Sequence, residues 1–132
     1  MTGPTPKKIV LMVSPGRQST EAFHFCLHKA KEGGRKLSVI YALNGDGESP
    51  ERSKKILEEA ARQCRTFQVP FETGVQSGDY FELCSRLTTN GEVDLLVVAE
   101  KKRGFFKKLI EGSESGRLKG RVSCDLKIYR SD

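Results

Sequence analysis

The sequence lacks any apolar segment that could cross a membrane, because no stretch approaches the roughly 18 apolar residues that a transmembrane helix needs. Its first eight residues, MTGPTPKK, also lack the apolar centre of a signal peptide. Internal repeats and low-complexity segments are missing as well. At 132 residues the chain has the length of one domain. We therefore expect a single cytoplasmic domain with no membrane insertion.

Cysteine is sparse, and its spacing fits neither a metal site nor a redox motif. The four cysteines contain no C-x-x-C pair, and they are Cys26, Cys64, Cys84 and Cys124. Three of them fall on helix faces that we predict to be buried. We interpret all four as reduced thiols with a structural role.

No arrangement of residues predicts catalysis. A Ser-His-Asp, Cys-His or paired-carboxylate set cannot be assembled from the order of the residues. His24 and His28 stand four residues apart on a predicted helix, so they could share a metal, but no third ligand is evident. We expect solvated histidines, no metal site, and a protein that is not an enzyme.

Positive charge is in excess and is unevenly placed. The formal net charge is +6, and from Ala99 onward ten Lys or Arg face only five Asp or Glu. A basic end of this kind suggests anionic partners, although it also fits an ordinary solvated surface. Because no nucleic-acid motif and no interleaving of aromatic with basic residues occurs, we expect no nucleic-acid partner.

Short apolar runs recur along the chain and predict strands buried on both faces. The predicted strands are residues 8–13 (KIVLMV), residues 37–43 (LSVIYAL), part of 67–75, residues 93–99 and the segment from 124. Pro70 lies inside the third of these segments and favours an edge position, since proline cannot donate to a strand ladder.

Amphipathic stretches between these runs predict helices. The first apolar stripe consists of Ala22, Phe23, Cys26, Leu27 and Ala30, and the second of Ile56, Leu57, Ala60, Ala61 and Cys64. Asp79 caps a third helix, whose inward residues are Phe81, Cys84 and Leu87. A fourth, short helix opens at Gly112-Ser113.

The alternation of strand and helix predicts an α/β fold with a single open five-stranded parallel sheet, doubly wound and with helices on both faces. This Rossmann-like domain is expected to span residues 7–132, after a flexible N-terminus at 1–6.

The chain resembles the universal stress proteins over nearly its whole length. The resemblance is carried by KIVLMV, KLSVIYAL, the Gly78-Asp79 turn, VDLLVVAE and GSESGRL before a closing strand. It implies a sheet order of 3-2-1-4-5, a non-catalytic role in stress response or signalling, and a homodimer paired through strand five. In this order strands one and four lie side by side at the topological switch point, where ligands bind outside the carboxyl ends of the strands.

The family's nucleotide motif, Gly-x2-Gly-x9-Gly-(Ser/Thr), is only partly kept. Its last two residues are Gly112-Ser113, but the earlier glycines correspond to Lys102 and Ala99. By the same resemblance, the Asp that ends strand one is replaced by Ser14. The candidate ligand-binding residues that the resemblance implies are Ser14, Ala42, Val98, Ala99, Lys102, Gly112, Ser113 and Ser115.

Each of these positions carries an implied role. Ser14 would meet a ribose, Ala42 and Val98 would flank an adenine, and Ser115 would add a hydroxyl on the phosphate side. Ala99 places a methyl where backbone must come close to the ligand.

Two interpretations of the basic loop remain open. Its cations, which are Lys101, Lys102, Arg103, Lys107 and Lys108, could replace the backbone amides as a phosphate clamp. The protein would then sense ATP, AMP or another small phosphate ligand at the switch point. Alternatively, the loop lost its ligand and is solvated, so that the protein does not bind ATP in the family's usual way. We favour the second interpretation.

Overall fold

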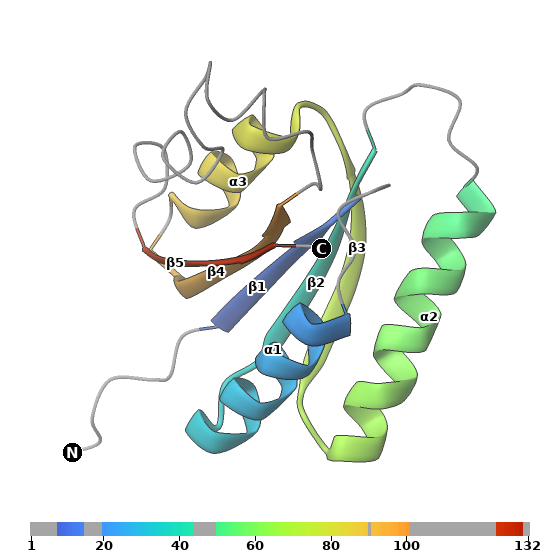
Figure 1. Cartoon of the computed structure of the whole chain (residues 1–132), viewed down its shortest axis with the longest axis vertical. Coiled ribbons are helices and arrows are strands. Elements are labelled where there is room, and N and C mark those ends of the chain that lie inside the picture. Colours follow the sequence, from blue (N-terminus) through green and yellow to red (C-terminus); the bar gives the residue numbers. More distant parts are fainter. Residues whose placement is uncertain (1–7, 15–19, 44–49, 90, 101–123, 131–132) are drawn as a thin grey trace.

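The computed structural model describes residues 8–14, 20–43, 50–89, 91–100 and 124–130, which form a parallel sheet covered on both faces by helices (Figure 1). The elements follow the chain in the order β1 (Lys8–Val13), α1 (Thr20–Gly33), β2 (Leu37–Leu43), α2 (Pro50–Phe67), β3 (Phe71–Ser77), α3 (Tyr80–Thr88), β4 (Val93–Glu100) and β5 (Asp125–Arg130). The fourth predicted helix, from Gly112, lies outside the described residues.

All five strands are parallel and lie in the order β3-β2-β1-β4-β5, which confirms the open sheet and the predicted strand order. The order reverses between β1 and β4, so these two strands flank the switch point. In Figure 1, α1 and α2 cover one face of the sheet, and α3 covers the other. Within the described part of the chain, no helix is long and apolar enough to span a membrane.

The sheet separates two hydrophobic cores. Successive β1 side chains point to opposite faces, so Ile9 and Leu11 join the core under α1 and α2, whereas Val10 and Met12 join the core under α3. Burial on both faces explains why β1 and β2 are continuous apolar runs.

Each helix turns its predicted stripe toward the sheet, although Phe23, Ile56, Ala61 and Leu87 are only half-buried. On α1 the buried residues are Ala22, Cys26, Leu27 and Ala30, and Gly34, at a φ of 63°, follows the helix end. On α2, Leu57, Ala60 and Cys64 are buried. The Asp79 side chain caps α3, since its Oδ2 accepts from the backbone N–H groups of Phe81 and Glu82 at 3.1 Å each.

The third strand starts later than its sequence suggests. α2 continues to Phe67, and β3 begins only at Phe71, so Pro70 lies just before the strand rather than inside it. The carbonyl of Pro70 still accepts from the Leu37 N–H at 2.9 Å, and this bond opens the ladder between β2 and β3. The predicted edge position is confirmed, because β3 ends the sheet.

Candidate functional site

Four of the predicted site residues meet at the carboxyl edge of the sheet. Met12 pairs with Val98, and Val13 pairs with Tyr41, so the register brings Ser14, Ala42 and Ala99 to neighbouring strand ends. All four are buried, with exposed fractions of 8% for Ser14, 3% for Ala42, 2% for Val98 and 1% for Ala99. These positions therefore form one edge across β2, β1 and β4.

The side chains at this edge are small and uncharged. Ala42 and Val98 belong to the core under α3, where the Tyr80 hydroxyl donates to the Met12 carbonyl at 3.3 Å. Ser14 offers a hydroxyl, which can bond to a sugar but brings no charge. These four positions therefore supply no charge, and any strong hold on phosphate has to come from elsewhere.

The phosphate side of the predicted site cannot be placed. Lys102, Gly112, Ser113 and Ser115 fall in the segment 101–123, outside the described residues. The choice between a cationic clamp and a solvated loop therefore stays a prediction from the sequence.

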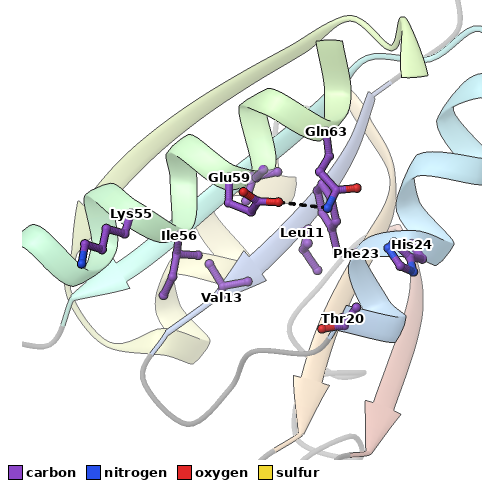
Figure 2. Close-up of a pocket in the computed structure, with 11 residues that line it drawn as sticks. Leu11, Val13, Thr20, Phe23, His24, Lys55, Ile56, Glu59 and Gln63 are labelled. Carbon is purple, nitrogen blue, oxygen red and sulfur yellow. Dashed lines mark hydrogen bonds between the residues drawn. The ribbon is translucent and has the colours of Figure 1, made fainter. Parts of the chain in front are cut away.

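A cleft between α1 and α2 begins next to this edge, at Val13 (Figure 2). Its volume is about 480 Å³, within the range of small-molecule sites. The floor is apolar and consists of Leu11, Val13, Val39 and Ala60. Figure 2 shows Phe23 and Ile56 on the two helices that flank this floor.

Polar side chains line the rim of the cleft. Lys55, Glu59 and Gln63 follow one row of α2 at a spacing of four residues, and Thr20 and His24 line the α1 side. The Gln63 amide donates to Glu59 at 3.1 Å, and the Arg62 guanidinium donates to the same carboxylate. The hydrogen bond from Arg62, followed by that from Gln63, lowers the pKa of Glu59. Glu59 is therefore held as an anion beside an apolar floor.

The sequence interpretation missed this cleft. The only available signal was the polar row on α2, because four-residue spacing places Lys55, Glu59 and Gln63 on one side of the buried stripe. That signal did not show that α1 and α2 stay apart above β1 and β2.

The histidines lie at the surface, and three of the four cysteines are buried. His24 and His28 are both exposed, and no group of three metal-ligating side chains occurs within the ranges that the structure covers. Cys26, Cys64 and Cys84 are buried free thiols, as predicted. Burial raises the pKa of the Cys64 thiol to about 11, which disfavours the reactive thiolate.

Comparison with known families agrees with the α/β fold and the sheet order. A model of the universal stress protein family matches residues 5–130. The chain belongs to this family. Comparison with curated proteins gives no match.

Several solved universal stress proteins share the fold. One, in complex with cAMP, is 19% identical with a TM-score of 0.73, and the match covers 96% of this chain and 100% of the other. One from Arabidopsis thaliana with AMP bound is 19% identical (TM-score 0.62, coverage 94% and 92%). One from Archaeoglobus fulgidus in complex with dAMP is 15% identical (TM-score 0.67, coverage 93% and 97%). At such identities the likeness establishes the fold alone.

Proposed function

We propose that this universal stress protein is a cytoplasmic, non-catalytic module of stress response or signalling that does not hold ATP in the family's usual way. The observation that carries the proposal is the edge at the switch point. Ser14 ends β1 without a carboxylate, and Ala99, 1% exposed, places a methyl in the packed end of β4.

The physical argument concerns close approach. A phosphate cradle made of backbone N–H groups needs the ligand to come against bare main chain, which glycine allows and a Cβ atom hinders. Ala99 and Lys102 stand at the two glycine positions of the family pattern. Lys102 adds a long side chain at the second position, and Ser14 removes the charge that would organise a ribose or a metal.

The test is a calorimetric titration with ATP, ADP and AMP at low and high salt. We expect no heat from the wild type at millimolar nucleotide. The triple variant Ser14→Asp, Ala99→Gly, Lys102→Gly restores the family pattern and should gain ATP binding. The double variant that keeps Lys102 is the matched control, and it should gain less. Tight, salt-insensitive ATP binding by the wild type would contradict the proposal.

A second candidate function is the sensing of AMP or a related phosphate compound at the switch point. It is supported by the small residues that meet at the carboxyl edge, by the 480 Å³ cleft that begins at Val13, and by the relatives that bind cAMP, AMP and dAMP. In this case the same titration gives a heat of binding that falls as salt is added, because salt screens exposed cations. The Lys102→Ala variant then gives no heat of binding.

We also propose that the protein forms a homodimer through β5. The residues Cys124, Leu126 and Ile128 are half-buried against the α3 core, while Asp125 and Lys127 are exposed. Tyr129, which the alternation groups with Asp125 and Lys127, is instead half-buried against the core under α1 and α2, so both faces of β5 touch a core. Because β5 ends the sheet, its outer edge can pair with a second copy.

A further inference from the structure

The opposite edge of the sheet, at β3, presents unpaired backbone groups. The ladder to β2 starts with the Leu37 N–H donating to the Pro70 carbonyl and ends with the Gly78 N–H donating to the Leu43 carbonyl, each at 2.9 Å. In a parallel ladder the bonding residues alternate. The N–H and C=O groups that point away from β2 therefore belong to Phe71, Thr73, Val75 and Ser77. No residue that the structure describes bonds to these backbone groups.

Within the described residues, the β3 strand itself carries none of the usual protections, although Pro70 lies just before it. Natural edge strands are blunted by lysine, by proline or by bulges that interrupt pairing. The strand reads FETGVQS, and its pairing with β2 runs without a break from Phe71 to Ser77. Its single charge, Glu72, forms ion pairs with Lys36 at 2.9 Å and Lys8 at 3.3 Å instead of facing outward.

An apolar groove of about 470 Å³ lies beside the same edge, between β3 and α2. Leu57 and Ala61 of α2 line one wall, and Thr73 and Val75 of β3 line the other. Val75 is 45% exposed, and it is the one large apolar side chain left exposed in the described ranges. Ala61 has a small side chain, so the groove stays open at the middle of the helix.

We propose that the β3 edge and this groove together bind an extended segment of a partner polypeptide. The segment adds as a further strand beside β3 and places an apolar side chain against Val75 and Ala61. The outward N–H and C=O groups of β3 recur every second residue, about 6.6 Å apart along the strand. This spacing matches that of the hydrogen-bonding groups in another extended backbone. The groove supplies a preference for an apolar residue, in addition to the backbone pairing.

The charges on α2 favour a different polypeptide over a second copy of this one. Arg65 lies over the Phe71 ring at 5.7 Å, near the start of β3, whereas Lys54 and Glu58, four residues apart on α2, both line the groove. Antiparallel pairing of β3 with its own copy would bring Lys54 of one protomer toward Arg65 of the other. A second copy would therefore present a cation to Arg65. Because Glu58 offsets Lys54 within the groove, we expect a segment with one acidic residue beside Arg65 and an apolar residue against the groove.

The experiment selects peptides from a random heptapeptide phage library on the wild-type protein, with counter-selection on Thr73→Pro. Proline at this position removes an outward N–H and leaves the bonds to β2 in place. We expect enriched peptides with alternating apolar residues and an Asp or Glu at the end that lies beside Arg65. If no peptide is enriched on the wild type over Thr73→Pro, the proposal is wrong.

Two pairs of variants then test an enriched peptide by fluorescence anisotropy. Thr73→Pro and Ala61→Phe, which fills the groove, should each raise the Kd about tenfold or more, equivalent to about 1.4 kcal/mol. The matched control Thr73→Ala keeps the outward backbone N–H, and Ala61→Ser keeps the groove open. Each control should change the Kd less than about twofold. A Kd that neither test variant changes would overturn the proposal.

Amide hydrogen exchange of the wild type provides a readout that does not depend on a variant folding. Peptide binding should slow exchange at Thr73 and Val75, whose N–H groups point outward, but not at Gly74, whose N–H faces β2. Unchanged exchange at Thr73 and Val75 would count against the added strand. A dimer that Thr73→Pro dissociates would show that a second copy occupies the edge, and would overturn the choice of partner.

Discussion

Glu72 is the residue in which the charges at the amino edge of the sheet converge. Lys36 and Lys8 reach its carboxylate from β2's start and from β1, at 2.9 and 3.3 Å. The hydrogen bond from Lys36 is the largest influence, and those from Ser38 and Lys8 add to it, so the pKa of Glu72 falls to about 2. Three neighbouring strands are thereby tied together at the edge opposite the candidate ligand site.

This pairing predicts a specific pH dependence. The pKa of Glu72 is about 2 in the folded protein and near 4.5 in the unfolded chain, so its stabilisation is fully present above about pH 5 and is lost as the pH falls toward 2. Because the side chain is 40% exposed, we expect less than about 1 kcal/mol from it. Denaturant unfolding of wild type and Glu72→Gln should be measured at pH 7, 4 and 2.5. The difference between their free energies of unfolding should shrink as the pH falls. A difference that is constant over this range would contradict the assignment.

At the scale of the elements, burial decides how well a segment can be predicted from its sequence. β1 and β2 have the bounds that their apolar runs predict, because both faces of each strand are covered. The prediction was poorer for β3, where one edge is open and the residues alternate between half-buried and exposed. Without a continuous apolar run, Phe67 could not be recognised as the end of α2.

The candidate site divides in the same way. The fold and the family pattern together placed Ser14, Ala42, Val98 and Ala99 at strand ends, and the register shows that these ends are neighbours. The α1–α2 cleft could not be predicted, because its shape depends on the distance between two helices. Periodicity tells which face of a helix is buried, but not how closely two helices approach.

The buried helix faces give a prediction for stability. Leu27 of α1 is 0% exposed and Leu57 of α2 is 8% exposed, and both pack in the same core. Truncating either to alanine should lower the free energy of unfolding by about 2–5 kcal/mol, since a cavity remains. The exposed Glu32→Ala on α1 serves as the control, and should change it by less than about 0.5 kcal/mol. Unchanged denaturation midpoints for both leucine variants would contradict the assignment of Leu27 and Leu57 to the buried helix faces.

At the scale of the whole molecule, the strands at the two edges of the sheet differ in charge. β5 carries Lys127 in its middle, with its Nζ 5.5 Å from the centre of the Phe25 ring and 5.3 Å from that of Tyr129. β3 carries no lysine. The proposed homodimer uses the β5 edge and the proposed peptide site uses the β3 edge. Because these strands lie at opposite ends of the sheet, the two proposed interactions do not compete.

The dimer proposal is tested by light scattering across micromolar concentrations. We expect the mass of two chains for the wild type, because the open β5 edge pairs with its copy. Thr73→Pro, at the far edge, is the control and should show the same mass. A mass equal to that of a single chain at every concentration would contradict the dimer proposal.

The sheet divides the interior into two cores, and this division affects which substitutions the protein can tolerate during evolution. The core under α1 and α2 and the core under α3 share β1, but alternate β1 side chains belong to different cores. Substitutions that loosen one compartment leave the packing of the other intact, so their costs add without compounding. Of the strand-end residues at the switch point, Ala42 and Val98 belong to the core under α3, whereas Ser14 and Ala99 belong to neither core. A lineage can therefore vary Ser14 and Ala99 without changing the membership of either core, while changes at Ala42 and Val98 also carry a packing cost.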